Sequence, residues 1–276
     1  MKALKHPGIC KICGQFKELT EEHIPPKHAF NSTTVTVLPF EEAIKVMTGA
    51  DGRLPWDTQG LNGRRQQGGH KKYCLCRECN NNTGAWYMRA YTDLAKTAHV
   101  MIQKEGLEIG NAYAFAIKNL YPLRIYKAMM TMMCDINNDC FGDDNLRDFL
   151  MTKESKSIDA SRYSLYMYLV STQMPRISGI FAIASLNNLQ APVLVTEMAS
   201  YPIGFALYLD KPDDYSPFGL NIDAFATYDY DTKCDIQFVG MPYLDINSQF
   251  PADYRSKDDI IRCIVSNEEV KDDSNE

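Results

Sequence analysis

The spacing of apolar residues changes near residue 162 and divides the chain into a helical part and a strand-rich part. Before that point apolar positions recur every three or four residues, which predicts helices over 80–104, 121–134 and 145–152. A shorter helix is expected at 40–47, FEEAIKVM, and the β-branched stretch at 31–38 predicts a strand or an extended arm.

Beyond residue 162, runs of β-branched and aromatic residues are separated by Pro, Gly and Asn, which is typical of strands and turns. The predicted strands cover residues 163–172, 177–186, 193–200, 202–209 and 234–240. Their close spacing favours an antiparallel sheet. We therefore expect an α+β fold, in which a small N-terminal module and a helical middle precede a sheet that packs on the helices.

Three parts follow from this organisation. Residues 1–100 form the N-terminal module, with an irregular, turn-rich insertion at about 39–69 that contains TGADGRLPWD and LNGRRQQGG. Residues 101–265 form an α+β accessory or interaction domain. The acidic tail at 266–276 lacks aromatic residues and is expected to be disordered.

We expect the chain to stay in the reducing cytoplasm. None of its apolar runs approaches the roughly 20 residues that cross a bilayer, and the first twenty residues lack the apolar core of a signal peptide. Nine cysteines in that compartment indicate a metal site or free thiols, because disulfides are rare where thiols are kept reduced. We expect no contact with membranes.

The net charge of −6 is unevenly distributed. Residues 1–100 carry 14 Lys and Arg against 9 Asp and Glu, a balance of +5, so the remainder carries −11. Within 61–91 there are six basic residues and a single acid, Glu78. A basic segment in an acidic protein suggests a polyanionic ligand, although a solvated surface would have the same composition.

Two CxxC pairs, Cys10 with Cys13 and Cys76 with Cys79, supply the four thiolates of a tetrahedral structural zinc site. The 62 residues between the pairs exceed the spacing of a simple zinc ribbon, which implies a folded insertion. Cys74 offers an alternative CxC pair with Cys76. Equal spacing on both sides favours the CxxC assignment and leaves Cys74 as an ordinary thiol in a strand.

Between these pairs stand Glu22 and His23, and Asn80 follows the last cysteine directly. This order resembles the HNH, or His-Me finger, endonucleases, most closely those built on a zinc treble clef such as the phage recombination endonuclease VII group. The resemblance covers about residues 8–95. It rests on Cys10, Cys13, Glu22, His23, Cys76, Cys79 and Asn80, with Gly68 and Gly69 before the second pair.

The resemblance implies a zinc-stapled ββα module. His23 would be the general base that activates water, since its unperturbed pKa lies near neutral pH. Glu22 and Asn80 would hold a catalytic Mg²⁺ or Mn²⁺ ion, which stabilises charge on the scissile phosphate. Zn²⁺ would be structural.

The sequence departs from the family pattern in two ways. Glu22 stands where many members have Asp. The middle Asn that orients the histidine has no clear counterpart, and its place is taken by His70 or Lys71. His70 could orient His23, contact phosphate or be an ordinary surface residue. Asn81 and Asn82 are predicted to cap the following helix rather than to bind the metal.

The expected ligand is nucleic acid held by its phosphates, with little sequence specificity. The predicted contacts are Arg64, Arg65, His70, Lys71 and Lys72. The resemblance favours DNA and leaves RNA open; it also suggests an effector of a bacterial antiphage or mobile-element system. The acidic C-terminal part is expected to bind a protein partner or to self-associate. The alternatives are a zinc treble clef that binds nucleic acid without cutting it, and a structural partner in a larger complex.

Overall fold

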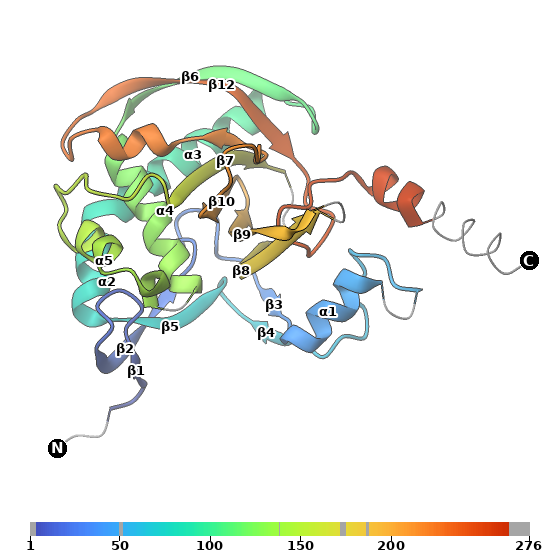
Figure 1. Ribbon diagram of the computed structural model, residues 1–276, viewed down its shortest axis with the longest axis horizontal. Helices are drawn as coiled ribbons and strands as arrows, with labels where there is room; N and C mark the ends of the chain where they lie inside the picture. The colour runs from blue at the N-terminus through green and yellow to red at the C-terminus, as the bar shows by residue number, and fades with distance from the viewer. Residues whose placement is uncertain (1–3, 50–51, 138, 172–174, 186–187, 265–276) are drawn as a thin grey trace, which may run out of the picture.

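The computed structural model describes residues 4–49, 52–137, 139–171, 175–185 and 188–264. The chain is mixed α+β (Figure 1). Its helices are α1 (Phe40–Thr48), α2 (Arg77–Thr83), the π-helix η2 (Gly84–Met88), α3 (Arg89–Lys104), α4 (Pro122–Ile136), the 3-10 turn η3 (Asp139–Gly142), α5 (Asp144–Met151) and the 3-10 turn η4 (Asp223–Thr227). Residues 257–264 form one more helix.

Its strands belong to three sheets. The small sheet contains β1 (Pro7–Ile9), β2 (Phe16–His23) and β5 (Lys71–Cys76), and a two-stranded ribbon contains β3 (Val35–Val37) and β4 (Arg64–Gln66). The large sheet contains β6 (Ala112–Leu120), β7 (Tyr163–Val170), β8 (Arg176–Ser185), β9 (Asn188–Ser200), β10 (Ile203–Leu209), β11 (Leu220–Asn221) and β12 (Cys234–Leu244).

The large sheet has the strand order β6-β12-β7-β10-β9-β8, with β11 paired to β7. All five predicted strands are present, and the predicted antiparallel pairing holds for every pair of this sheet in the described residues except one: β12 runs parallel to β7 at Tyr243 and Leu244. β12 also continues past the predicted end at 240 and pairs with β6, which the sequence analysis did not predict. β12 extends this far because it pairs with β6, a strand that lies more than a hundred residues earlier in the sequence.

The predicted helices at 40–47, 121–134 and 145–152 are confirmed within two residues at each end. The helical segment predicted at 80–104 is present and ends as predicted, but it begins earlier, at Arg77. It is also not one regular helix, since it consists of α2, η2 and α3 in succession. Asn81 and Asn82 lie inside α2 and do not cap it, because the N-cap position belongs to Cys76. The strand expected over 31–38 is shorter and is limited to β3.

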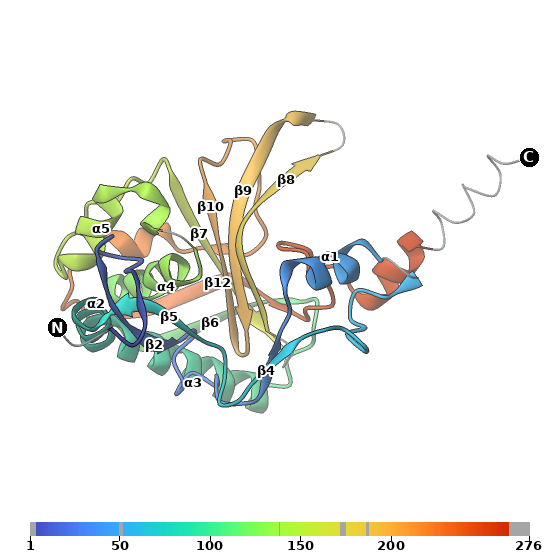
Figure 2. The ribbon, with the colours of Figure 1, turned by 90° about the horizontal axis from the view of Figure 1, so that it is seen from below.

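Helices α2, α3, α4 and α5 lie on one side of strands β7 to β10, and the lobe around α1 lies on the other side with the C-terminal segment (Figure 2). Thirteen of the fifteen residues of α4 are buried, which makes it the central helix and explains why its sequence is apolar on all sides. One continuous core joins the N-terminal cysteines to the sheet, so that Cys10, Met129 and Phe205 belong to the same buried cluster.

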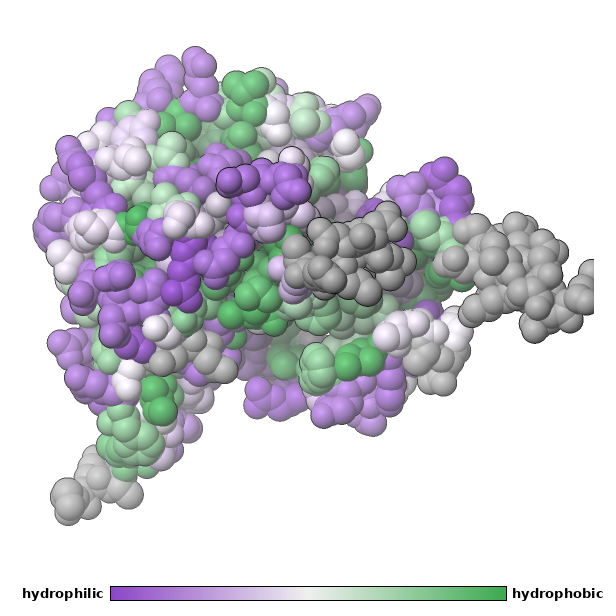
Figure 3. All heavy atoms as spheres, viewed as in Figure 1, coloured by the Kyte–Doolittle hydropathy of each residue, from purple (hydrophilic) through white to green (hydrophobic). Residues whose placement is uncertain are grey.

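The N-terminal module therefore shares a core with the helices and the large sheet, and its separation from an accessory domain stays a prediction. On the face seen in Figure 3, hydrophilic and apolar residues are interspersed, with a green area beside the N-terminal end. Exposed apolar residues near that end include Leu4 and Ile9. The tail predicted to be disordered at 266–276 lies outside the described residues.

Candidate metal centre and adjoining carboxylate site

The candidate site is built on the small sheet. β2 pairs antiparallel with β5, so that Glu22 stands opposite Lys72 and His23 opposite Lys71. A register shift in this ladder leaves Cys74 without a partner on β2. β2 ends at His23, and the two prolines that follow Ile24 explain this end, since proline has no N–H to continue a ladder.

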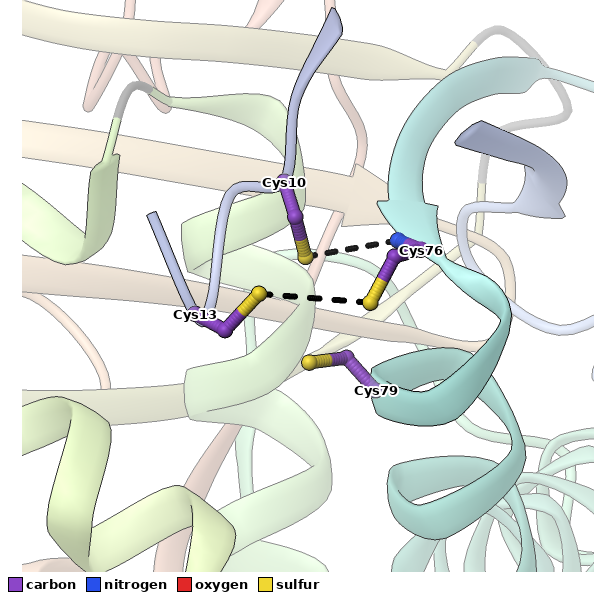
Figure 4. A group of neighbouring side chains, drawn as sticks. All are labelled: Cys10, Cys13, Cys76 and Cys79. Carbon is purple, nitrogen blue, oxygen red and sulfur yellow. Dashed lines mark hydrogen bonds between the residues drawn. The ribbon is translucent and has the colours of Figure 1, made fainter. Parts of the chain in front are cut away.

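The four cysteines of the two CxxC pairs meet at one point (Figure 4). Cys10 and Cys13 come from the turn before β2, Cys76 ends β5, and Cys79 lies one turn into α2. Their sulfur atoms all lie within 4.8 Å of one another, and the Sγ atoms of Cys13 and Cys76 are 3.9 Å apart. The cluster is therefore placed to bind a metal ion.

Zinc fits this geometry. Four sulfurs at the corners of a tetrahedron with Zn–S bonds of about 2.3 Å are about 3.8 Å apart, close to the observed spacing of Cys13 and Cys76. The Cys79 thiol lowers the pKa of Cys10 to about 4 by hydrogen bonding. That contact raises the pKa of Cys79, and burial raises that of Cys13. Without a cation the thiols therefore do not all ionise together, whereas a bound divalent ion would stabilise all four thiolates.

Asn80 directly follows Cys79 of this cluster, and Glu22 contacts Asn80. Both are half-buried, and the side chain of Asn80 forms hydrogen bonds with Glu22 and, at 2.9 Å, with the hydroxyl of Thr20. Burial raises the pKa of Glu22 to about 7, and the hydrogen bond from Asn80 only partly opposes this shift. The structure thus brings together the carboxylate and the amide that the sequence analysis assigned to one site.

His23 is held by the loop before β5. Its Nε2 atom lies 3.1 Å from the carbonyl oxygen of Gly68. Because a carbonyl only accepts, this contact places the proton of the neutral ring on Nε2, so that in this form Nδ1 carries the lone pair. The described hydrogen bonds do not connect the His23 ring to Glu22 or Asn80.

Asn31 fixes that loop, and the sequence analysis did not identify it. Its amide nitrogen donates to the carbonyl oxygens of Pro25 at 2.6 Å and His70 at 2.9 Å, and its Oδ1 accepts from the His70 N–H at 2.7 Å. A Cβ on Gly69 would lie 2.2 Å from the Asn31 carbonyl oxygen, and Gly69 has a φ of +96°, so only glycine fits there. Asn31 lies in a turn-like NSTT segment, where nothing distinguishes it from an ordinary loop residue.

The described hydrogen bonds do not connect the ring of His70 to His23. The Nδ1 atom of His70 lies 3.2 Å from the carbonyl oxygen of Ile24, and burial lowers the pKa of this ring. Lys71 forms an ion pair with Glu21 at 3.0 Å, and the ammonium of Lys72 lies 3.4 Å from the carbonyl oxygen of Ile136.

The two remaining predicted phosphate contacts lie away from this sheet. Arg64 and Arg65 are exposed on β4, in the ribbon that extends toward α1. Lys71 and Lys72 thus lie on β5, and the two arginines lie on β4, which the short connection at 67–70 joins to β5.

A second residue that the sequence analysis missed is Asp135, near the end of α4. It is fully buried, and neither of its carboxyl oxygens has a hydrogen-bond partner among the described residues. The available signal was an acid inside the apolar run MMTMMCDI, where a helical position is expected to face the core.

No protein family, curated protein or solved structure matches the chain. In the part of the chain that the structure describes, no helix combines the length and the apolar character that crossing a membrane requires.

Proposed function

We propose that the protein is a metal-dependent HNH endonuclease that hydrolyses phosphodiester bonds in DNA with little sequence specificity. The observation that carries the proposal is the contact of Glu22 with Asn80. In the sequence Glu22 directly precedes His23, and Asn80 directly follows Cys79 of the four-cysteine cluster. In this proposal β2, β5 and α2 are the ββα module, and zinc holds the turn before β2 against the first turn of α2.

His23 is the general base. With its Nε2–H donated to Gly68, the lone pair on Nδ1 is available to take a proton from the attacking water. Gly68 supplies by its backbone the orienting contact that the family obtains from the middle Asn. Asn31 acts indirectly, because its hydrogen bonds join this loop at His70 to the segment after His23 at Pro25.

Glu22 and Asn80 would hold the catalytic Mg²⁺ or Mn²⁺. Oxygen ligands suit such hard cations, and ion binding would replace the hydrogen bond between these side chains by contacts from the Glu22 carboxylate and the Asn80 Oδ1. When bound, the ion would stabilise negative charge on the scissile phosphate and on the leaving oxygen. A cation would also relieve the cost of ionising Glu22 in a half-buried position.

The basic side chains of this region would hold the substrate by its phosphates. Arg64 and Arg65 are exposed and suited to this role. We assign no base-specific contact to any of them, which agrees with cleavage of little sequence preference. A protein partner for the acidic C-terminal part and a role in antiphage defence remain part of this proposal.

A plasmid-nicking assay with Mg²⁺ or Mn²⁺ tests the proposal. Wild-type protein should convert supercoiled plasmid to nicked and linear forms, and His23→Ala should lose this activity while it keeps its zinc and its affinity for DNA. A matched control is His28→Ala, because His28 is exposed beyond the same prolines and has no part in the proposed chemistry.

The outcomes separate the readings of the sequence. Cleavage that is equal in wild type and in a zinc-loaded His23→Ala variant would exclude His23 as the base. DNA binding without cleavage by any variant would support a zinc module that only binds nucleic acid. Failure to bind DNA even at low salt, where electrostatic binding is strongest, would support a purely structural role.

A further inference from the structure

Asp135 is the most unusual charged residue of the described chain. It is completely buried in α4, and neither of its carboxyl oxygens has a hydrogen-bond partner among the described residues. The neighbouring Cys74 thiol donates instead to the carbonyl oxygen of Lys72, at 3.6 Å. Burial raises the pKa of Asp135 well above its usual value. Buried acids are normally paired or hydrogen-bonded, so a buried carboxyl group without a partner needs an explanation, and a bound cation would provide one.

The surroundings of Asp135 identify the site that it faces. Glu22 and Lys72 are opposite one another in the β2–β5 ladder, so their side chains project from the same face of the small sheet. The Lys72 ammonium reaches the carbonyl oxygen of Ile136, the residue after Asp135. The face that carries Glu22 is therefore turned toward the end of α4.

Electrostatic effects agree with this placement. Beyond burial, the charges of Glu22 and Cys10 contribute to raising the pKa of Asp135, whereas the Cys74 thiol and the charge of Lys72 oppose the shift. The Glu22 and Asp135 carboxyl groups are thus close enough to repel one another, and Asn80 is hydrogen-bonded to Glu22. The Lys72 ammonium is directed to a backbone oxygen. Such a pair is stabilised by a divalent cation, which favours both ionised forms.

We propose that Asp135 is a third protein ligand for the divalent cation held by Glu22 and Asn80. The inference rests on the proposed function and adds to it a residue from outside the N-terminal module. Asp135 would form the buried base of the site, behind the half-buried Glu22 and Asn80. The helical part of the chain would then complete the metal site, and the N-terminal module alone would bind the ion more weakly.

Mn²⁺ binding to the full chain tests this assignment without a cleavage assay. The free Mn²⁺ signal in electron paramagnetic resonance gives the dissociation constant at pH 8 for wild type, Asp135→Asn, Glu22→Gln and Glu21→Gln. Glu21→Gln is the matched control, because Glu21 adjoins Glu22 but pairs with Lys71. We expect Asp135→Asn and Glu22→Gln each to weaken binding at least tenfold, and Glu21→Gln to change it less than twofold.

Zinc content and melting temperature show whether each variant is folded. Asp135→Asn conserves shape and removes a buried ionisable group, so its metal-free form should melt at the wild-type temperature or above. If only Glu22→Gln weakens Mn²⁺ binding, the inference fails and the Glu22 site stands. If wild type binds no Mn²⁺, the inference and the proposed metal site both fail.

A second measurement uses wild type alone, in case Asp135→Asn does not fold. Fe²⁺ bound in place of Mn²⁺ generates hydroxyl radicals with peroxide and ascorbate, which cut the backbone next to the ion. We expect cuts near residues 22, 80 and 135, suppressed by excess Mn²⁺. Cuts near 22 and 80 without one near 135 would overturn the assignment of Asp135.

Discussion

Replacing Asn31 by Ala should destabilise the protein moderately and reduce nicking far more than the loss of stability explains. Asn31 is buried and forms three hydrogen bonds, of 2.6, 2.9 and 2.7 Å, with backbone groups of Pro25 and His70. The substitution leaves two carbonyl oxygens and one N–H without these partners. The loop between β4 and β5 then loses its connection to the segment after His23, and with it the fixed position of the Gly68 carbonyl.

The expected size follows from these contacts. At about 1 kcal/mol per intramolecular hydrogen bond, three bonds correspond to about 3 kcal/mol of unfolding free energy. With an unfolding entropy of about 2 cal/mol/K per residue, a chain of 276 residues loses about 5 °C in melting temperature. Such a protein is almost fully folded at 25 °C, so unfolding alone would leave nicking nearly unchanged.

The assay compares Asn31→Ala with Lys127→Met. Lys127 also makes three hydrogen bonds to backbone oxygens, those of Phe149, Thr152 and Lys153, but these connect α4 to the end of α5. Thermal unfolding should show a loss of stability in both variants. Nicking at 25 °C, measured per folded molecule, should fall at least tenfold in Asn31→Ala and stay within twofold of wild type in Lys127→Met.

Two results would refute the reasoning. Wild-type nicking by Asn31→Ala would show that the hydrogen bonds of Asn31 do not position His23. An unchanged melting temperature would show that the three hydrogen bonds contribute nothing net to the folded state.

Four further predictions concern the metal centre, the Glu22 carboxylate and the large sheet. Cys79→Ser should lose the bound zinc and melt at a lower temperature, and metal analysis that still finds one zinc per chain would contradict this. Because the pKa of Glu22 is raised to about 7, Mn²⁺ should bind at least about tenfold more weakly at pH 6 than at pH 8, and a proton lost from Asp135 would make the difference larger. A flat pH profile would exclude Glu22 as a ligand. The same raised pKa means that the metal-free fold loses stability as the pH rises from 4.5 to about 7, since the folded state binds the proton more tightly. Arg176→Met should cost about 3–5 kcal/mol in urea unfolding, because it leaves the buried Glu197 carboxylate without its ion pair; a cost below about 1 kcal/mol would contradict this.

Local patterns in the sequence determined several features of the fold. Helical and strand periodicities identified α1, α4 and α5 and the five strands after residue 162, because alternation and three-to-four spacing follow from which face is buried. The equal CxxC spacing identified the four cysteines that meet in the structure, because a tight turn and one helical turn each present two sulfurs to a common point. The nuclease assignment itself stays a prediction.

Other features depended on contacts between distant segments. β6 has the alternating sequence AYAFAIKNL, but its role as the edge partner of β12 and the parallel pairing of β12 with β7 follow from the folding of the whole sheet. Sequence position likewise gave no sign that the partner of His23 is a backbone carbonyl, since any residue supplies one.

The sequence by itself determined the chemical groups of this protein: four thiols in two pairs, an acid beside a histidine, and an amide after the last cysteine. The tertiary structure decided which of them meet and in what environment. Asn31 holds the loop before β5 because folding brought His70 within hydrogen-bonding distance of its amide. Asp135 is a buried acid without a hydrogen-bond partner among the described residues because α4 is buried on nearly every side. Burial and hydrogen bonding are properties of the packed chain, and they are what turn an ordinary residue into a member of a site.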